Sequence, residues 1–294
     1  MKVLITGVKG FTGKYVSEFF SSKGWEVFGC GTQSVDSDPN YYQINLLDMA
    51  SVSKLVENIK PDYVVHLAAK AFVADSDVDS FYSVNICGTR NLLQALSQRS
   101  FPLKKLLIAS SANVYGNIYR SGPIQENAQP EPANDYAISK LSMEYVVNLW
   151  QDKVPVVMSR PFNYTGRGQN KRFVVPKIVN AFREKSEIVE LGNIDVERDF
   201  SDVRDVARIY FELLTSPTSQ LIYNVCSGHS YSLHHVIQNL TELTGHEIRV
   251  KVNPDFVRAS EVKVLVGDPS LLENQIGSVE ITPFSETLSW MVRE

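Results

Sequence analysis

Tyr136 and Lys140 are the two side chains of this sequence whose types and spacing best suit proton transfer. They stand four residues apart in Tyr136-Ala137-Ile138-Ser139-Lys140, so on a helix both project from one face. A phenol has an ordinary pKa of about 10, and we expect the Lys140 ammonium to lower the pKa of Tyr136. Taken alone, this spacing is more often a surface pair on a helix.

Ser111 adds a third group to this pair. The run Leu106–Ser110 is typical of a buried strand, and Ser111 follows it directly, 25 residues before Tyr136. Ligands of α/β proteins bind at the carboxyl ends of the strands. A hydroxyl there can donate a hydrogen bond to the same substrate oxygen that Tyr136 protonates.

Three glycines, Gly7, Gly10 and Gly13, follow the predicted strand Val3–Thr6 and open the first predicted helix. Such glycines permit a tight turn, close approach to a pyrophosphate and close helix–strand packing. The helix N-terminus then offers free N–H groups and the positive end of its dipole. The pattern predicts a dinucleotide site, with a purely structural turn as the alternative.

The residues after the second strand bear on the choice of dinucleotide. The strand Glu26–Cys30 continues into Gly31-Thr32-Gln33-Ser34, without the carboxylate that would hold the ribose of NAD and repel the 2′-phosphate of NADP. We therefore favour NADP(H), and NAD(H) stays possible because no arginine stands there either. Asn45-Leu46-Leu47-Asp48 could flank an adenine or begin a helix capped by Asp48.

Strand-like runs alternate with helical patterns through the N-terminal half, which predicts an α/β fold with a doubly wound parallel sheet of the Rossmann type and a smaller C-terminal lobe. Residues 1–162, with about 198–225, would form the NAD(P)-binding domain, and 163–197 and 226–294 the lobe. The strand-like runs are Val3–Thr6, Glu26–Cys30, Tyr63–Leu67, Leu106–Ser110, Val154–Ser159 and Leu221–Val225; helical patterns include Tyr15–Phe20, Val52–Ile59 and Val203–Leu214.

The composition excludes several classes of protein. The chain has 294 residues, is 44% hydrophobic and carries a net charge of −4, so it lacks the basic field of a nucleic-acid partner. Three separated cysteines indicate a reducing compartment. The short apolar start and the lack of an apolar stretch of about 18 residues lead us to expect a cytoplasmic protein with no membrane partner. His234-His235 lacks Cys or acidic partners at metal-ligand spacing, so we expect no metal.

The order of these motifs resembles that of the extended short-chain dehydrogenases/reductases, in their nucleotide-sugar branch. The resemblance runs from residue 3 to about residue 205 and includes His66-Leu67-Ala68-Ala69, Asn85-xx-Gly88-Thr89, Ser110-Ser111-xx-Val114-Tyr115-Gly116 and Arg160-Pro161-Phe162-Asn163. It implies that Ser111, Tyr136 and Lys140 are the catalytic residues. The cofactor would contact Gly7, Gly10, Phe11, Gly13, Thr32, Asn45, Leu46, Leu67, Ala68, Ala69, Tyr136 and Lys140, the last through the nicotinamide ribose.

The second half is similar, in particular, to GDP-4-keto-6-deoxy-mannose reductases, in residues 160–169, 198–205 and 223–228. The resemblance implies a lobe that binds a nucleotide-diphosphate sugar through Ser111, Asn163, Val174, Arg198, Arg258 and Glu261. Guanidinium groups bind phosphate bidentately. Arg198 could instead pair with Asp199 or Asp202, and Arg258 could be a solvated surface residue. Arg167 and Ala259 depart from the prolines usual in relatives.

The residues after Ser111 bear on the type of reaction. Dehydratases of this group need an acid and a base there, and the chain has Ala112-Asn113, so we expect reduction of a C4 ketone in deoxysugar biosynthesis, for lipopolysaccharide or another cell-surface polysaccharide. The substrate would be a GDP-linked 4-keto-6-deoxyhexose, with the dTDP-linked sugar next. The alternatives are a 4-epimerase with bound NAD and, less favoured because Tyr136 and Lys140 are both present, a non-catalytic dinucleotide sensor.

Two predicted helices suggest a homodimer. The regions 76–99 and 134–152 carry apolar residues that look exposed, and relatives use these two helices to form a four-helix interface. The alternative is that these residues only pack on the sheet. They are Phe81, Leu92, Val147 and Trp150.

Overall fold

Seven parallel strands form the central sheet of the computed structural model, which describes residues 1–34, 38–73, 77–117, 122–257 and 261–293. The strand order is β10-β6-β5-β4-β1-β2-β3, which confirms the predicted doubly wound parallel sheet. The strands are β1 (Lys2–Thr6), β2 (Glu26–Gly31), β3 (Tyr41–Gln43), β4 (Tyr63–His66), β5 (Lys105–Ala109), β6 (Val156–Pro161) and β10 (Ile222–Val225).

The bounds of the six predicted strands differ from those found by one or two residues, and β3 was not predicted. The largest shift is at β6, predicted from Val154, because the Val154 N–H bonds to Trp150 O (2.9 Å) and closes the preceding turn. Pairing with β5 therefore begins at Pro155, whose carbonyl accepts from Leu106 N (2.8 Å).

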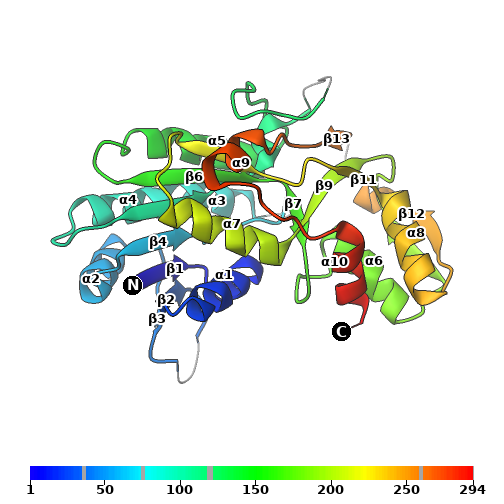
Figure 1. The fold of residues 1–294 in the computed structure, drawn as a ribbon, viewed down its shortest axis with the longest axis horizontal. Helices are drawn as coiled ribbons and strands as arrows, with labels where there is room; N and C mark the ends of the chain where they lie inside the picture. The colour runs from blue at the N-terminus through cyan, green and yellow to red at the C-terminus, as the bar shows by residue number, and fades with distance from the viewer. Residues whose placement is uncertain (35–37, 74–76, 118–121, 258–260, 294) are drawn as a thin grey trace.

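Helices cover both faces of the sheet (Figure 1). On one face, α2 (Met49–Ile59), α4 (Thr89–Ser97) and α5 (Asp135–Asn148) bury one hydrophobic core, and on the other, α1 (Phe11–Ser22), α7 (Val203–Thr215) and α9 (Ser270–Ile276) bury a second. The side chains at helical spacing are the buried ones, for example Val16 and Phe20 of α1. A short helix, α3 (Val78–Tyr82), runs into a π-helical turn (Ser83–Gly88) and then into α4.

The apolar residues that we expected to be exposed on the two predicted dimer helices are not exposed. Phe81, Leu92 and Val147 are buried, and Trp150 packs against the core beneath α4 and α5. That expectation was wrong because Leu92, Val147 and Trp150 pack in the core between these helices and the sheet, and Phe81 packs edge-on to Tyr136 of α5. The exposed apolar residues of α5 and its C-cap are instead Ile138, Tyr145 and Leu149.

A smaller lobe stands at the far end of the molecule from the N-terminus (Figure 1). Its sheet joins β7 (Asn163–Thr165), β9 (Glu197–Asp202), β11 (Ser230–Ser232) and β13 (Val264–Leu265), and β8 (Ile188–Leu191) pairs with β12 (Arg249–Val252). Helices α6 (Val174–Arg183), α8 (Leu233–Thr244) and α10 (Phe284–Val292) enclose its core. Because β9 pairs within the lobe whereas α7 and β10 join the main sheet, the chain crosses between the two parts, and the exact domain bounds stay a prediction.

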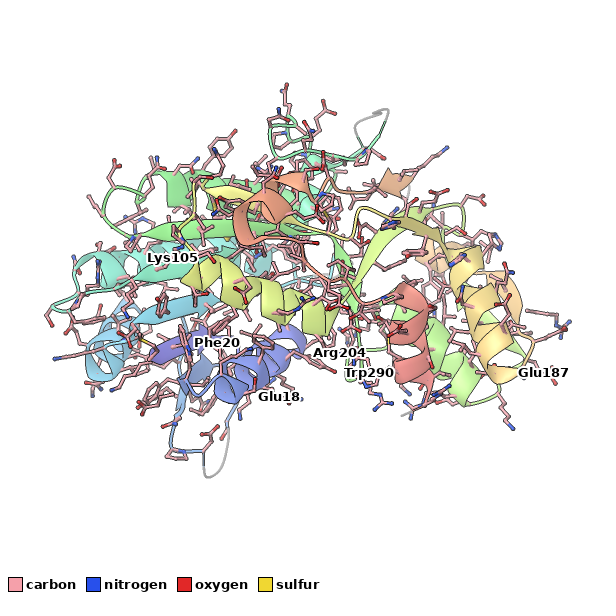
Figure 2. The ribbon with its side chains drawn as sticks, in the orientation of Figure 1. Glu18, Phe20, Lys105, Glu187, Arg204 and Trp290 are labelled. Atoms are coloured by element: carbon pink, nitrogen blue, oxygen red, sulfur yellow. The ribbon has the colours of Figure 1, made fainter. Side chains whose placement is uncertain are left out.

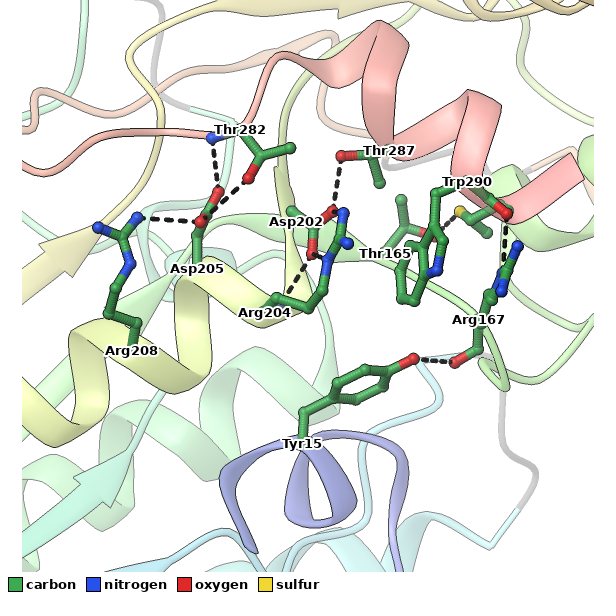
Figure 3. A network of polar contacts seen from close by, with 11 residues as sticks. Tyr15, Thr165, Arg167, Asp202, Arg204, Asp205, Arg208, Thr282, Thr287 and Trp290 are labelled. Atoms are coloured by element: carbon green, nitrogen blue, oxygen red, sulfur yellow. Dashed lines mark hydrogen bonds and ion pairs between the residues drawn. The ribbon is translucent and has the colours of Figure 1, made fainter. Parts of the chain in front are cut away.

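Trp290 fastens the C-terminal helix α10 to the rest of the chain. The guanidinium carbon of Arg204 lies 3.9 Å from the centre of its indole ring, and that of Arg167 lies 5.1 Å away (Figures 2 and 3). Arg167 Nε also donates to Trp290 O (2.8 Å). Arg167 therefore holds α10 against the loop after β7.

No helix within the described residues is long and apolar enough to cross a membrane. In the same part of the chain, no group of three or more His, Cys, Asp or Glu residues could hold a metal ion.

Candidate active site

The glycine-rich loop is shaped for close approach by a ligand. Gly7 has φ of +72°, and a Cβ there would lie 2.9 Å from Ala68 N, so a side chain is excluded by both conformation and space. A Cβ on Gly13 would lie 2.3 Å from Gly7 O. Gly10 precedes α1 without a side-chain cap, and the first turn has no acidic residue. The first N–H groups of α1 are therefore open to an anion, which fits a dinucleotide pyrophosphate.

The predicted cofactor residues lie around one edge of the sheet. The glycine-rich loop follows β1, Thr32 follows β2 and Leu67–Ala69 follow β4, and parallel neighbouring strands end on the same edge. Leu46 differs, because its side chain is buried in the core and only its backbone could face a ligand. Asp48 accepts from the N–H groups of Ala50 (3.1 Å) and Ser51 (3.2 Å), so it does cap α2, and an adenine beside Asn45 stays a prediction.

His66, at the end of β4, belongs to a buried hydrogen-bond chain that sequence reasoning missed. Thr89 Oγ1 donates to Asn85 O (2.7 Å), so it accepts from His66 Nε2 (2.8 Å). His66 Nδ1 then accepts from Thr6 Oγ1 (2.7 Å), which in turn accepts from Ala68 N (3.1 Å). Burial, with the nearby Lys140 charge, lowers the pKa of His66 to about 3, so the ring is neutral. These hydrogen bonds connect the end of β1, from which the glycine-rich loop starts, to the Leu67–Ala69 loop after β4.

Ser111 and Tyr136 meet beside this edge. Tyr136 is buried in the first turn of α5, with Phe81 edge-on to its ring (5.9 Å between centres). Ser111 Oγ accepts from Asn113 N (3.2 Å) and Nδ2 (3.1 Å), which leaves the Ser111 hydrogen to be donated elsewhere.

The pKa of Tyr136 does not behave as expected from the sequence. Burial raises it to about 12, and the neighbouring Ser111 hydroxyl lowers it by a smaller amount. The predicted lowering by Lys140 was wrong, because desolvation of the phenolate is the larger effect. Tyr136 is therefore a protonated phenol at neutral pH, which suits a proton donor.

Lys140 lies one turn further along α5 and points to the end of β5. Its Nζ donates to Ala109 O (2.8 Å). Burial lowers the pKa of Lys140 to about 8, and the Glu144 carboxylate opposes that shift. Lys140 therefore remains mostly charged at neutral pH, and titrates within the range of ordinary assays.

Glu144 and Arg160 form a buried ion pair, and the Glu144 carboxylate acts electrostatically on Lys140. Arg160 Nη2 and Nε donate to the Glu144 carboxylate at 2.6 and 2.9 Å, and Ser110 Oγ donates to Glu144 Oε1 at 2.5 Å. Arg160 Nη1 reaches Tyr115 Oη (3.0 Å). Sequence reasoning did not single out Glu144, although it continues the four-residue spacing of Tyr136 and Lys140.

The predicted substrate residues lie on the lobe side. Asn163 begins β7, Val174 begins α6 and Arg198 lies in β9. Arg198 Nη2 donates to Glu261 Oε1 (2.6 Å), so the ion pair of Arg198 joins two residues that were both predicted to bind substrate. Arg258 and Ala259 fall outside the described residues.

The alternative pairing of Arg198 with Asp199 or Asp202 is not the arrangement found. Asp199 accepts from the N–H groups of Ser227 and Gly228, each at 2.9 Å. Asp202 accepts from Arg204, Nη2 at 2.6 Å (Figure 3). Both carboxylates thus hold neighbouring loops and helices.

The chain matches the family described as GDP-mannose 4,6 dehydratase over residues 4–291. It belongs to this family. The family has the extended short-chain dehydrogenase/reductase fold, so the resemblance drawn from the sequence motifs is confirmed, and the chain is a nucleotide-sugar-modifying member of that group.

Three relatives illustrate the similarity. A GDP-6-deoxy-D-talose 4-dehydrogenase of Aggregatibacter actinomycetemcomitans is 37% identical, over 95% of this chain and 92% of its own length. A GDP-6-deoxy-D-mannose reductase of Pseudomonas aeruginosa strain PAO1 is 32% identical over 94% and 91%. A P. aeruginosa structure of that reductase (RMD) complexed with NADPH has a TM-score of 0.85, with 30% identity over 99% of this chain and 96% of that one.

A further solved structure is that of a Burkholderia cenocepacia J2315 protein, provisionally named an epimerase, which superposes with a TM-score of 0.92. It is 42% identical over 99% of this chain and 97% of its own.

Proposed function

We propose that this protein reduces the C4 ketone of a GDP-linked 4-keto-6-deoxyhexose with a reduced nicotinamide dinucleotide. The observation that carries the proposal is the buried, protonated Tyr136 beside the Ser111 hydroxyl, followed by Ala112-Asn113 where a dehydratase would need an acid and a base. The relatives named as a GDP-sugar 4-dehydrogenase and a GDP-sugar reductase support this substrate class.

The residues of the chain divide the work as follows. A bound reduced nicotinamide supplies the hydride for C4. Tyr136 donates its phenolic proton to the C4 oxygen, and Ser111 donates a hydrogen bond that stabilises the charge developing on that oxygen. Lys140 places a positive charge near the phenolate that Tyr136 becomes, and would hold the nicotinamide ribose.

The favoured cofactor is NADPH, with NADH as the alternative. The residues after β2 carry no carboxylate to repel a 2′-phosphate, and the related reductase structure is a complex with NADPH. Epimerases with NAD also share the fold, so the dinucleotide class is better supported than the choice within it.

A 4-epimerase is the second candidate, favoured by the B. cenocepacia relative. An epimerase returns its hydride to the same sugar and consumes no dinucleotide, whereas a reductase consumes one dinucleotide for each keto-sugar. Purified protein should therefore oxidise NADPH in the presence of GDP-4-keto-6-deoxymannose. No oxidation with the GDP- or dTDP-linked keto-sugar, together with interconversion of UDP-hexoses, would overturn the proposal.

We further propose a homodimer formed through α5. Ile138 and Tyr145 of this helix and its C-cap Leu149 lie along one exposed face, at spacings of seven and four residues. Apolar side chains repeated on one helix face favour burial against a partner. The cytoplasm, as a reducing compartment, remains the predicted location.

A further inference from the structure

Tyr164 lies where the glycine-rich edge meets the substrate side of the site. Its hydroxyl is 2.8 Å from Thr12 Oγ1, and its ring is stacked on Phe11, with 6.2 Å between ring centres and 11° between planes. Phe11 and Thr12 open α1, whose N-terminus is open to a pyrophosphate. Asn163, the residue before Tyr164, is a predicted ligand of the sugar nucleotide. The Tyr164 side chain thus contacts the first turn of α1, and the residue before it is a predicted substrate ligand.

Further contacts extend this junction along α1. Tyr15, one turn after Phe11 and edge-on to it (5.7 Å), donates to Arg167 O (2.8 Å) in the loop after β7 (Figure 3). Arg167 in turn donates to Trp290 O of α10. The first turns of α1, the β7 loop and the C-terminal helix therefore form one packed unit.

Tyr164 is also close to the reacting group, since its proximity contributes to the raised pKa of Tyr136. When two ligands order the same contact, the first to bind removes part of the ordering cost of the second, and the effect is reciprocal. We propose that Tyr164 is a positioning residue that couples dinucleotide binding to sugar-nucleotide binding through its contacts with Thr12 and Phe11. This inference rests on the proposed function, because it requires both ligands.

The test is a pair of calorimetric titrations. The dissociation constant of NADPH is measured alone and with saturating GDP, and the ratio of the two is the coupling factor. For the wild type we expect NADPH to bind at least about 5-fold more tightly with GDP present. Tyr164→Phe keeps the ring and removes the hydroxyl, and the loss of one neutral hydrogen bond should reduce the coupling factor about 5-fold. Thr12→Val removes the same hydrogen bond from the α1 side and should reduce the coupling factor equally. The double variant should show no larger reduction than either single variant.

Tyr223→Phe is the matched control. Tyr223 lies in β10, and its hydroxyl donates to Gln275 Oε1 of α9 (2.7 Å). Its removal should leave the wild-type coupling factor unchanged. The inference is overturned if the wild type binds both ligands without coupling, or if Thr12→Val and Tyr164→Phe keep the wild-type factor. Should the wild type bind no dinucleotide at all, it is the proposed function that fails. Coupling with dTDP in place of GDP would support Tyr164 and contradict the GDP assignment.

Discussion

Tyr136 carries the chemical step at the scale of single residues. Tyr136→Phe removes the proton donor but keeps the ring that Phe81 contacts. We expect turnover to fall about 10²- to 10⁴-fold, while the dissociation constant of NADPH stays close to that of the wild type. Steady-state oxidation of NADPH and a binding titration measure the two quantities. Tyr145→Phe, an exposed position on the same helix, is the control, and an active Tyr136→Phe variant would contradict the assigned role.

Lys140 should set the alkaline limit of the reaction. Its pKa is lowered to about 8 by burial, so the ammonium is present below that pH and lost above it. Tyr136, with a pKa raised to about 12, and His66, with a pKa lowered to about 3, do not change charge in this range. Because the ammonium stabilises the phenolate left by proton transfer, turnover should fall as the pH rises through about 8.

A pH profile of kcat tests this assignment, and the same profile of a Glu144 variant tests it a second time. Glu144 opposes the lowering of the Lys140 pKa, so Glu144→Gln should move the alkaline limb to lower pH. A limb near the ordinary lysine value of 10.5 would contradict the lowering of the Lys140 pKa by burial.

At the scale of elements, the Glu144–Arg160 pair joins α5 to β6. Both side chains are buried, so removing one leaves an uncompensated charge, which costs about 3–5 kcal/mol. Glu144→Gln and Arg160→Met should each lower the free energy of unfolding in urea by about that amount. The double variant should lose much less than the sum of the two.

The control for this cycle is Glu187→Gln, whose ion pair with Arg249 is highly exposed and should not measurably change stability. Additive effects of the two core substitutions would mean that Glu144 and Arg160 stabilise the protein independently.

The sequence was most informative for elements whose pattern is local. Strand runs and helical periodicities gave the sheet and the helices on both faces, because hydrophobic spacing reports directly which side chains meet the core. The structure also brings Ser111 beside Tyr136, since residues at strand ends share one edge. The order of the motifs indicated the family, because the loops at the strand ends carry these motifs at fixed positions along the chain.

What the sequence did not reveal depends on contacts between distant segments. The burial of Leu46 follows from its packing near Gly88, and the His66 chain joins residues from three segments. The rise in the Tyr136 pKa is a property of burial, which neighbours in sequence do not report. The sequence shows that Phe81, Leu92 and Val147 are apolar, but it does not show which way their helices face. Whether these side chains are buried or exposed could therefore not be predicted.

At the scale of the whole molecule, the exposed face of α5 should hold two copies together. Leu149→Arg combined with Ile138→Arg would place charges in that interface, and we expect the protein to become monomeric. Size-exclusion chromatography with light scattering measures the mass. Leu243→Arg on α8, also an exposed apolar helix position, should leave the dimer intact. A monomeric wild type would contradict the proposed interface.

Stereospecifically deuterated NADPH, labelled at the transferred hydrogen, tests the central claim most directly. With GDP-4-keto-6-deoxymannose as substrate, we expect one NADPH oxidised for each sugar consumed and deuterium at C4 of the product, read by mass spectrometry and nuclear magnetic resonance. Interconversion of nucleotide sugars at C4 without label and without net oxidation of NADPH would contradict a reductase and identify an epimerase instead.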